Sequence, residues 1–322
     1  MTFLRLKLYF ISILCLFLML SESWAQDFRY NLFGYNSFGS NPAWAATKSE
    51  FNLTFHSRKQ FVTAGLSHKT LMLSALYPLK HTENYTSMIG ISFFDDRQNY
   101  FGRVQGFDLL GAFAVKISPK KPIFAALGIQ AGSREIDDEL RGADYFIAWS
   151  GGALLYQNEE SNPYRKKWFL GLSSYNWLQN ERYLENYQFN KKMRTIILAG
   201  FELWHNQKFA FIPNIRSILH ADLHFTNYGA SLRRYFSDNA GTLFRYGSWG
   251  ISAWYAPKQA INLAIDLDSP TINLGLSYGF SQNQHLFSYK NANEFIISLK
   301  KPLYQKKKDE KPIINEEEPV LE

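Results

Sequence analysis

The sequence is poor in cysteine and in long apolar runs. Cys15 is the one cysteine among 322 residues, which excludes a disulfide scaffold and a cysteine-based zinc site. After residue 20 no stretch approaches the roughly 20 apolar residues of a transmembrane helix. Charged residues make up 20% and aromatic residues 17%, a balance that is typical of a folded chain rather than a disordered one. We therefore expect a folded protein without disulfides or membrane-spanning helices.

Residues 1–25 have the pattern of a secretory signal peptide. Two basic residues precede an apolar stretch at residues 8–20, and small residues stand three and one positions before Gln26. We expect cleavage between Ala25 and Gln26, which would remove Cys15 with the leader. The alternative is an uncleaved membrane anchor, although the apolar stretch is shorter than the ~20 residues that span a bilayer.

From residue 50 onward, segments of about 8 to 12 residues alternate apolar with small or polar side chains, and turn residues separate them. This alternation puts the two kinds of side chain on opposite faces of a strand. At residues 271–278, for example, every second side chain is large and apolar or aromatic. The fourteen candidate strands are 51–56, 70–77, 87–94, 104–117, 123–131, 146–156, 167–174, 194–204, 208–218, 219–236, 243–255, 260–267, 271–280 and 293–300.

A soluble β-sandwich would also alternate, but several features favour a transmembrane antiparallel β-barrel of the outer-membrane type. The polar faces are rich in Gly, Ser, Asn and charge, as a barrel lumen is, and the strand number is even. Short links at 118–122, 205–207 and 268–270 contrast with long ones at 95–103, 132–145, 175–193 and 281–292. Aromatic residues near strand ends predict girdles at the membrane interfaces: Tyr77, Phe94, Tyr156, Trp168, Trp204, Tyr255 and Phe280.

The strand count depends on residues 219–236, which form one strand or a hairpin that turns near Thr226 to Tyr228. Residues 50–304 are expected to make the barrel, and two segments lie outside it. Residues 26–49 show little periodicity, and we expect them to plug the lumen or to lie beneath the barrel. Residues 305–322 hold blocks of basic and acidic residues, which predict a disordered periplasmic tail or a contact arm for a partner.

Several short motifs occur in a characteristic order. The sequence reads SNPAW at 40–44, FNLTF at 51–55, RKQ at 58–60, SMIGISFFDD at 87–96, LGIQAGS at 127–133, WFLGLSS at 168–174 and NEFIISL at 293–299. In this order and spacing, residues 26–300 resemble the PorP/SprF family of outer-membrane proteins of the type IX secretion system in Bacteroidota. Residues 230–268 match loosely, and the charged tail extends beyond the usual end of the family.

The resemblance implies a fourteen-stranded, non-catalytic barrel in the outer membrane. The pattern of short and long links is the one expected when both termini are periplasmic. The resemblance also implies partners: secreted proteins with a C-terminal sorting domain, such as large gliding adhesins, and other components of the secretion and gliding machinery. The alternative is a general outer-membrane channel or a transporter of apolar ligands. Outer-membrane lipid is the remaining expected partner.

The residues carry little signal for other chemistry, and we expect no catalytic site, cofactor or metal. His220, Asp222 and His224 alternate and would share one face of a strand, where a polar stripe facing the lumen is the interpretation we favour over a zinc site. Asp95 and Asp96, like Asp137 to Glu139, lack the ordered spacing of a calcium loop. No Gly-x-Ser-x-Gly elbow or phosphate-binding glycine loop is present.

The positive charge is spread over pairs of basic residues rather than gathered in one stripe, so nucleic acid is not an expected partner. Residues 26–304 hold 29 basic and 21 acidic residues. The pairs are expected at strand ends, facing lipid headgroups or an acidic partner: Arg58-Lys59, Arg165-Lys166-Lys167, Lys191-Lys192, Arg233-Arg234 and Lys300-Lys301.

The long link at 175–193 carries Trp177, Tyr183 and Tyr187. Aromatic side chains often anchor protein interfaces, so we predict that these three contact the secreted partner. Packing of the rings over the barrel mouth is an equally good interpretation of the same residues.

Overall fold

The structure is a computed structural model in which a closed barrel surrounds part of the lead-in segment. It describes residues 32, 36–62, 67–98, 102–138, 142–160, 162, 165–177, 193–206, 208–220, 223–236, 244, 246–257, 260–281 and 289–302. Among these residues no helix is long and apolar enough to cross a membrane.

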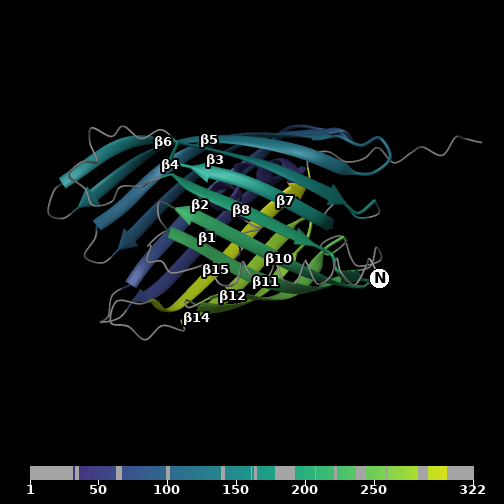
Figure 1. The fold of residues 1–322 in the computed structure, drawn as a ribbon. Helices are drawn as coiled ribbons and strands as arrows, with labels where there is room; N and C mark the ends of the chain where they lie inside the picture. The colour runs from purple at the N-terminus through teal and green to yellow at the C-terminus, as the bar shows by residue number, and fades with distance from the viewer. Residues whose placement is uncertain are drawn as a thin grey trace, which may run out of the picture.

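Fourteen antiparallel strands form the closed ring, which confirms the predicted fold (Figure 1). Each strand pairs with its neighbours in the chain, and β1 closes the ring on β15. The two-residue strand β9 (Trp204–His205) only extends the edge of β10 beyond β8. The fourteen strands are β1 Glu50–Val62, β2 Ser67–His81, β3 Tyr85–Gln98, β4 Gly102–Lys116, β5 Ile123–Asp138, β6 Gly142–Asn158, β7 Lys166–Tyr175, β8 Arg194–Phe201, β10 Phe209–His220, β11 Leu223–Tyr235, β12 Ser248–Ala256, β13 Ala260–Asp268, β14 Ile272–Ser281 and β15 Tyr289–Pro302.

The alternation of the sequence becomes an apolar outer face and a polar inner face. On β14, Leu276 and Tyr278 are exposed on the outside, whereas Asn273 and Ser277 are buried inside. On β7, Leu170 and Leu172 are likewise half exposed, and Ser173 is buried. Closure of the ring gives every strand a paired neighbour on both sides, so no open sheet edge faces lipid.

The predicted aromatic girdles are wrong at two positions. Tyr77, Trp204, Tyr255 and Phe280 are exposed on the outside. Tyr156, however, is 3% exposed and stacks on Phe124 with 5.2 Å between ring centroids, and Phe94 packs against the same buried cluster. Both fall on the inward phase of their strands, where the lumen is wide enough to hold rings.

The predicted contrast between short and long links holds only in part. The end of the barrel where β1 begins and β15 finishes is named here the terminal end. At the opposite end, β3 runs on to Gln98 and β5 to Asp138, so the predicted loops at 95–103 and 132–145 are mostly strand. The link 176–193 is long, as predicted, but another long link, 236–247, lies at the terminal end. The strands extend into the predicted loops because backbone pairing between neighbouring strands continues regardless of the polarity of the side chains.

Residues 219–236 are divided differently from either prediction. Leu219 and His220 finish β10, and β11 begins at Leu223. The chain therefore reverses between His220 and Leu223, which pair with each other, and not near Thr226. This turn makes two strands of the region 208–236, so the total of fourteen is kept.

Part of the lead-in segment lies inside the barrel and is named here the plug segment: Leu32 and residues 36–49. It contains the short helix α2 (Ser37–Ser40) and the 3-10 helix η2 (Pro42–Thr47). The side chain of Asn36 accepts a hydrogen bond from Gly39 N, and that of Asn41 accepts one from Ala43 N, as helix caps do. Of the two predicted placements for this segment, the structure shows the lumen.

Small residues let the plug segment approach the wall closely. Ala43, Ala45 and Ala46 are buried in one apolar cluster with side chains of the wall. The amide of Asn41 donates to the carbonyls of Ala153 and Leu172 at 3.1 and 3.3 Å. On β5, a Cβ atom at Gly128 would lie 2.5 Å from Ala43 N, so only glycine leaves room for the plug backbone there.

This contact predicts a specific effect of substitution. Gly128→Val should lower the free energy of unfolding by about 1–3 kcal/mol, because the added side chain overlaps the backbone of the plug segment. Gly111→Ala is the matched control, since a Cβ atom at Gly111 on the adjacent β4 has no atom within 4 Å. Urea unfolding of both variants in detergent measures the difference, and equal stability would contradict the packing described.

Candidate functional site

A buried latch joins the plug segment to the barrel seam. His56 Nε2 on β1 lies 2.8 Å from Glu294 Oε1 on β15, and both side chains are completely buried. The same carboxylate oxygen accepts a hydrogen bond from Leu32 N at 3.0 Å. On its other side, His56 Nδ1 lies 3.3 Å from Asn36 Nδ2. Because a buried carboxylate needs all of its partners, these contacts fix where the plug segment sits.

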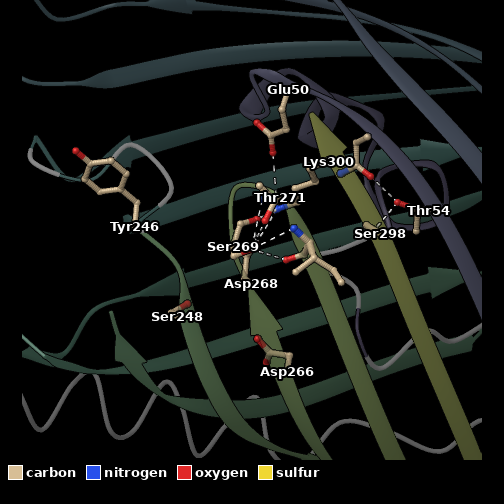
Figure 2. A network of polar contacts seen from close by, with 12 residues as sticks. Glu50, Thr54, Tyr246, Ser248, Asp266, Asp268, Ser269, Thr271, Ser298 and Lys300 are labelled. Carbon is tan, nitrogen blue, oxygen red and sulfur yellow. Dashed lines mark hydrogen bonds and ion pairs between the residues drawn. The ribbon is translucent and has the colours of Figure 1, made fainter. Parts of the chain in front are cut away.

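A second polar network fills the lumen at the terminal end (Figure 2). Lys300 Nζ lies 2.8 Å from Asp268 Oδ1 and 3.7 Å from Glu50 Oε1, and it donates to Ser269 O at 2.9 Å. Arg233 binds the carboxylate of Asp266. These groups come from strands at both ends of the chain, and ring closure brings them together.

The strand phase divides the basic pairs between two environments, which the sequence interpretation missed. Arg58 and the side chain of Lys300 are buried in the lumen, whereas their neighbours Lys59 and Lys301 are exposed outside. The prediction that whole pairs face headgroups or partners is therefore wrong. On β1, the strict alternation that begins at Asn52 is the sequence signal that places Arg58 inside and Lys59 outside.

Lys48 and Lys166 add unbalanced positive charge to this network. Among the described residues, no carboxylate oxygen lies within 4 Å of the ammonium group of either lysine. The ammonium group of Lys300, by contrast, has two such carboxylates. Burial and the nearby Lys300 lower the pKa of Lys48 from its ordinary value of 10.5 to about 8, and Lys166 contributes to the shift. Counted over the described residues, the terminal end of the lumen therefore carries more cations than anions.

At the opposite end, strands β3 to β6 form a projecting wall. On the side of the wall nearer the terminal end, the outward side chains are apolar. Phe93, Phe107 and Ile147 are the last of these apolar side chains toward the opposite end. Beyond this level the outward positions carry charged and polar residues, which pair on the surface: Asp95 with Arg103 at 2.6 Å, and Glu135 with Tyr145 at 2.8 Å. Since β5 and β6 exceed the 9–11 residues that cross a bilayer, this wall extends past the apolar band.

The predicted partner residues lie partly outside the described part of the chain. Trp177 follows Asn176, whose φ is 63°, and its N–H bonds to Trp149 O at 2.9 Å. Its ring covers Gly151 on the outer surface of β6, where any side chain would collide with it. Tyr183, Tyr187, Ala25 and Gln26 lie outside the described residues, so those predictions stay predictions.

The histidine stripe predicted at residues 220–224 is not one face of one strand. His220 and His224 belong to different strands, and Asp222 is outside the described residues. His224 points outward, with Nε2 2.6 Å from Ser217 Oγ, whereas Phe225 points inward and is buried. The predicted face is wrong because the chain reverses between His220 and Leu223, which puts the two histidines on separate strands. Within the described residues no group of three or more potential metal ligands gathers.

A comparison of the sequence with protein-family models gives one match. Residues 22–300 match the model described as type IX secretion system membrane protein PorP/SprF. The chain belongs to the PorP/SprF family. No curated protein sequence matches it.

Solved structures similar to this PorP/SprF protein share its fold at very low identity. The toluene transporter TbuX of Ralstonia pickettii has a TM-score of 0.54 and 8% identity, over 83% of this chain and 93% of that one. The toluene transporter TodX of Pseudomonas putida has a TM-score of 0.51 and 9% identity, over 88% and 96%. The monoaromatic hydrocarbon channel CymD gives 0.50 and 11%, over 82% and 92%. These similarities establish a barrel fold of the outer-membrane type.

The latch predicts how the plug segment of this family member is held. In a Cys15→Ser background, the thiol of Ser37→Cys reports opening of the plug segment, because Ser37 is buried on α2. Glu294→Ala should raise the rate of maleimide labelling about tenfold or more, since it removes the acceptor for two buried N–H groups. Glu135→Ala, which removes a surface carboxylate, should leave the rate unchanged. Equal rates in all three chains would show that the latch does not hold the plug.

The lowered pKa of Lys48 predicts a pH dependence. Between about pH 8 and 10.5 the unfolded chain keeps a proton on this lysine that the folded chain has lost, so stability should rise with pH. Lys48→Met should reduce this rise, whereas Lys301→Met, an exposed lysine at the same end, should leave it unchanged. Unfolding free energies measured in urea from pH 7 to 10.5 test the difference, and identical slopes for the three chains would contradict it.

Proposed function

We propose that this PorP/SprF protein is a non-catalytic outer-membrane barrel of the type IX secretion and gliding machinery. In this role it helps to deliver or anchor secreted proteins that carry a C-terminal sorting domain, such as large adhesins. Family membership over residues 22–300 is the observation that carries the proposal. The terminal end, with both ends of the barrel domain, would face the periplasm, and the projecting wall would face the cell exterior.

Two structural features support an accessory role over that of a general channel. The plug segment occupies the lumen and is held by buried hydrogen bonds from both β1 and β15. The projecting wall offers a charged, paired surface beyond the apolar band, which suits contact with another protein better than contact with lipid. The link after Trp177 begins beside this wall, because β7 pairs with β6.

Deletion of the gene provides the test. Loss of this barrel should abolish surface display of sorting-domain proteins and gliding, and the wild-type chain should restore both. The triple variant Trp177→Ala, Tyr183→Ala, Tyr187→Ala should reach the membrane but lose co-purification with the secreted partner. Undiminished surface display in the deletion strain, with related barrels also deleted, would refute the proposal.

Planar-bilayer recording separates the accessory role from the alternative of a general channel. The purified wild-type barrel should show no steady open conductance, because the plug segment stays in place. Glu294→Ala, which weakens the latch, should show intermittent openings. A steady, solute-selective conductance of the wild-type protein would favour the channel instead.

A further inference from the structure

A cavity of about 190 Å³ lies inside the barrel between the plug segment and the wall formed by β7 and β10 to β13. Aromatic rings make up much of its lining, including Trp44 of the plug segment and Trp254 and Tyr235 of the wall. Tyr246, in the link between β11 and β12, and Ser269, in the turn after β13, also line it. Both belong to the terminal end, so the cavity reaches that end of the barrel.

The size of the cavity sets the size of what it can hold. An apolar cavity of about 150 Å³ takes up benzene, so this one has room for a single ring with one small substituent. Its walls are mixed, with rings on several sides and four charged groups. This composition matches the usual pattern of a ligand pocket, in which apolar walls surround a few placed polar groups.

Of the four charged groups that line the cavity, three are already paired. Arg233 binds Asp266, and Asp268 lies 2.8 Å from Lys300. Lys166 is the fourth, and among the described residues no carboxylate lies within ion-pair distance of its ammonium group. Its ammonium lies instead near two rings, 5.8 Å from the centroid of Trp44 and 5.7 Å from that of Tyr156.

A β-bulge directs Lys166 into the lumen. Asn158 pairs with Lys166 and Gln157 with Trp168, so Lys167 has no partner of its own on β6. A bulge of this kind changes which face a side chain occupies. Without it, Lys166 would share the outward face of Trp168, Leu170 and Leu172. The inward, unpaired cation is therefore a consequence of one extra residue in the strand.

Tyr246, which lines the cavity, provides an independent observation. Its backbone φ is 61°, a left-handed conformation that is rare for residues with a bulky side chain and costs of order 1–3 kcal/mol. A glycine would adopt this conformation without strain. Residues in such conformations concentrate at ligand sites, and this one lines the cavity that Lys166 enters.

We infer that this cavity is a binding site for a small monoanionic carboxylate with a ring or a short apolar body. The carboxylate pairs with Lys166, and the body packs among Trp44, Trp254 and Tyr246. One unpaired cation matches one negative charge, and the paired groups around it exclude a second anion. The inference concerns a ligand of the lumen and does not rest on the secretion role.

Isothermal titration calorimetry of the full barrel in detergent, with benzoate as the probe, tests the site. Benzoate should bind the wild-type chain, and uncharged benzyl alcohol should bind about tenfold or more weakly, because it cannot form the charged contact with Lys166. Lys166→Met should weaken benzoate about tenfold or more and keep the barrel folded. Lys167→Met is the matched control, since Lys167 pairs with Glu159 at 3.2 Å on the bulge itself.

Tyr246→Gly separates a ligand role from a structural one. It should weaken benzoate while the barrel becomes no less stable, because glycine relieves the positive φ. Equal binding of benzoate and benzyl alcohol, unchanged binding by Lys166→Met, or no binding at millimolar benzoate would overturn the inference. Binding only after Glu316, Glu317 and Glu318 are changed to Gln would also overturn it, and would identify the tail of the chain as the occupant.

Discussion

The pairing of β1 with β15 is the interaction on which the rest of the structure depends. An open sheet would leave two rows of unpaired backbone groups, which lipid cannot satisfy. Closing the ring removes both rows and sets the inward residues of the first strand against those of the last. Thr54 meets Ser298 at 2.8 Å, His56 meets Glu294, and Glu50 meets Lys300. The seam therefore supplies both the latch for the plug segment and the centre of the terminal network, from residues more than 200 positions apart in the chain.

Much of the fold could be predicted from the sequence because a barrel strand has a strict period of two. Residues 271–278 show their inner and outer faces directly, and all fourteen strands were located. The reversal between His220 and Leu223 is hard to predict because only two residues separate β10 from β11, and the alternation shifts phase there. The prediction for Phe94 and Tyr156 fails for a related reason, because the phase of the strand, and not nearness to its end, decides which face a ring occupies.

The interior of the barrel was much less predictable than its wall. The lead-in segment gives little periodic signal, so its place in the lumen follows from contacts that only the folded chain makes, such as Asn41 with the carbonyls of β6 and β7. Likewise, the inward direction of Lys166 depends on a bulge, and a bulge is a property of two paired strands rather than of one sequence segment. The family resemblance predicted the class of protein but not the residues of the lumen.

The same barrel architecture occurs in hydrocarbon channels and in this secretion-family protein, so the wall alone does not decide function. What distinguishes this chain lies in two separate places. Outside, strands β3 to β6 continue beyond the apolar band and present charged residues where a lipid-facing wall would present none. Inside, η2 of the plug segment packs on the part of the wall formed by β3 to β6, and the cavity lies against β7 and β10 to β13. Contact with a partner protein on the projecting wall and occupancy of the cavity by a small ligand thus use different surfaces. A substitution that changes partner contact therefore need not change ligand binding in the cavity. Any coupling between the two surfaces would have to pass through the plug segment.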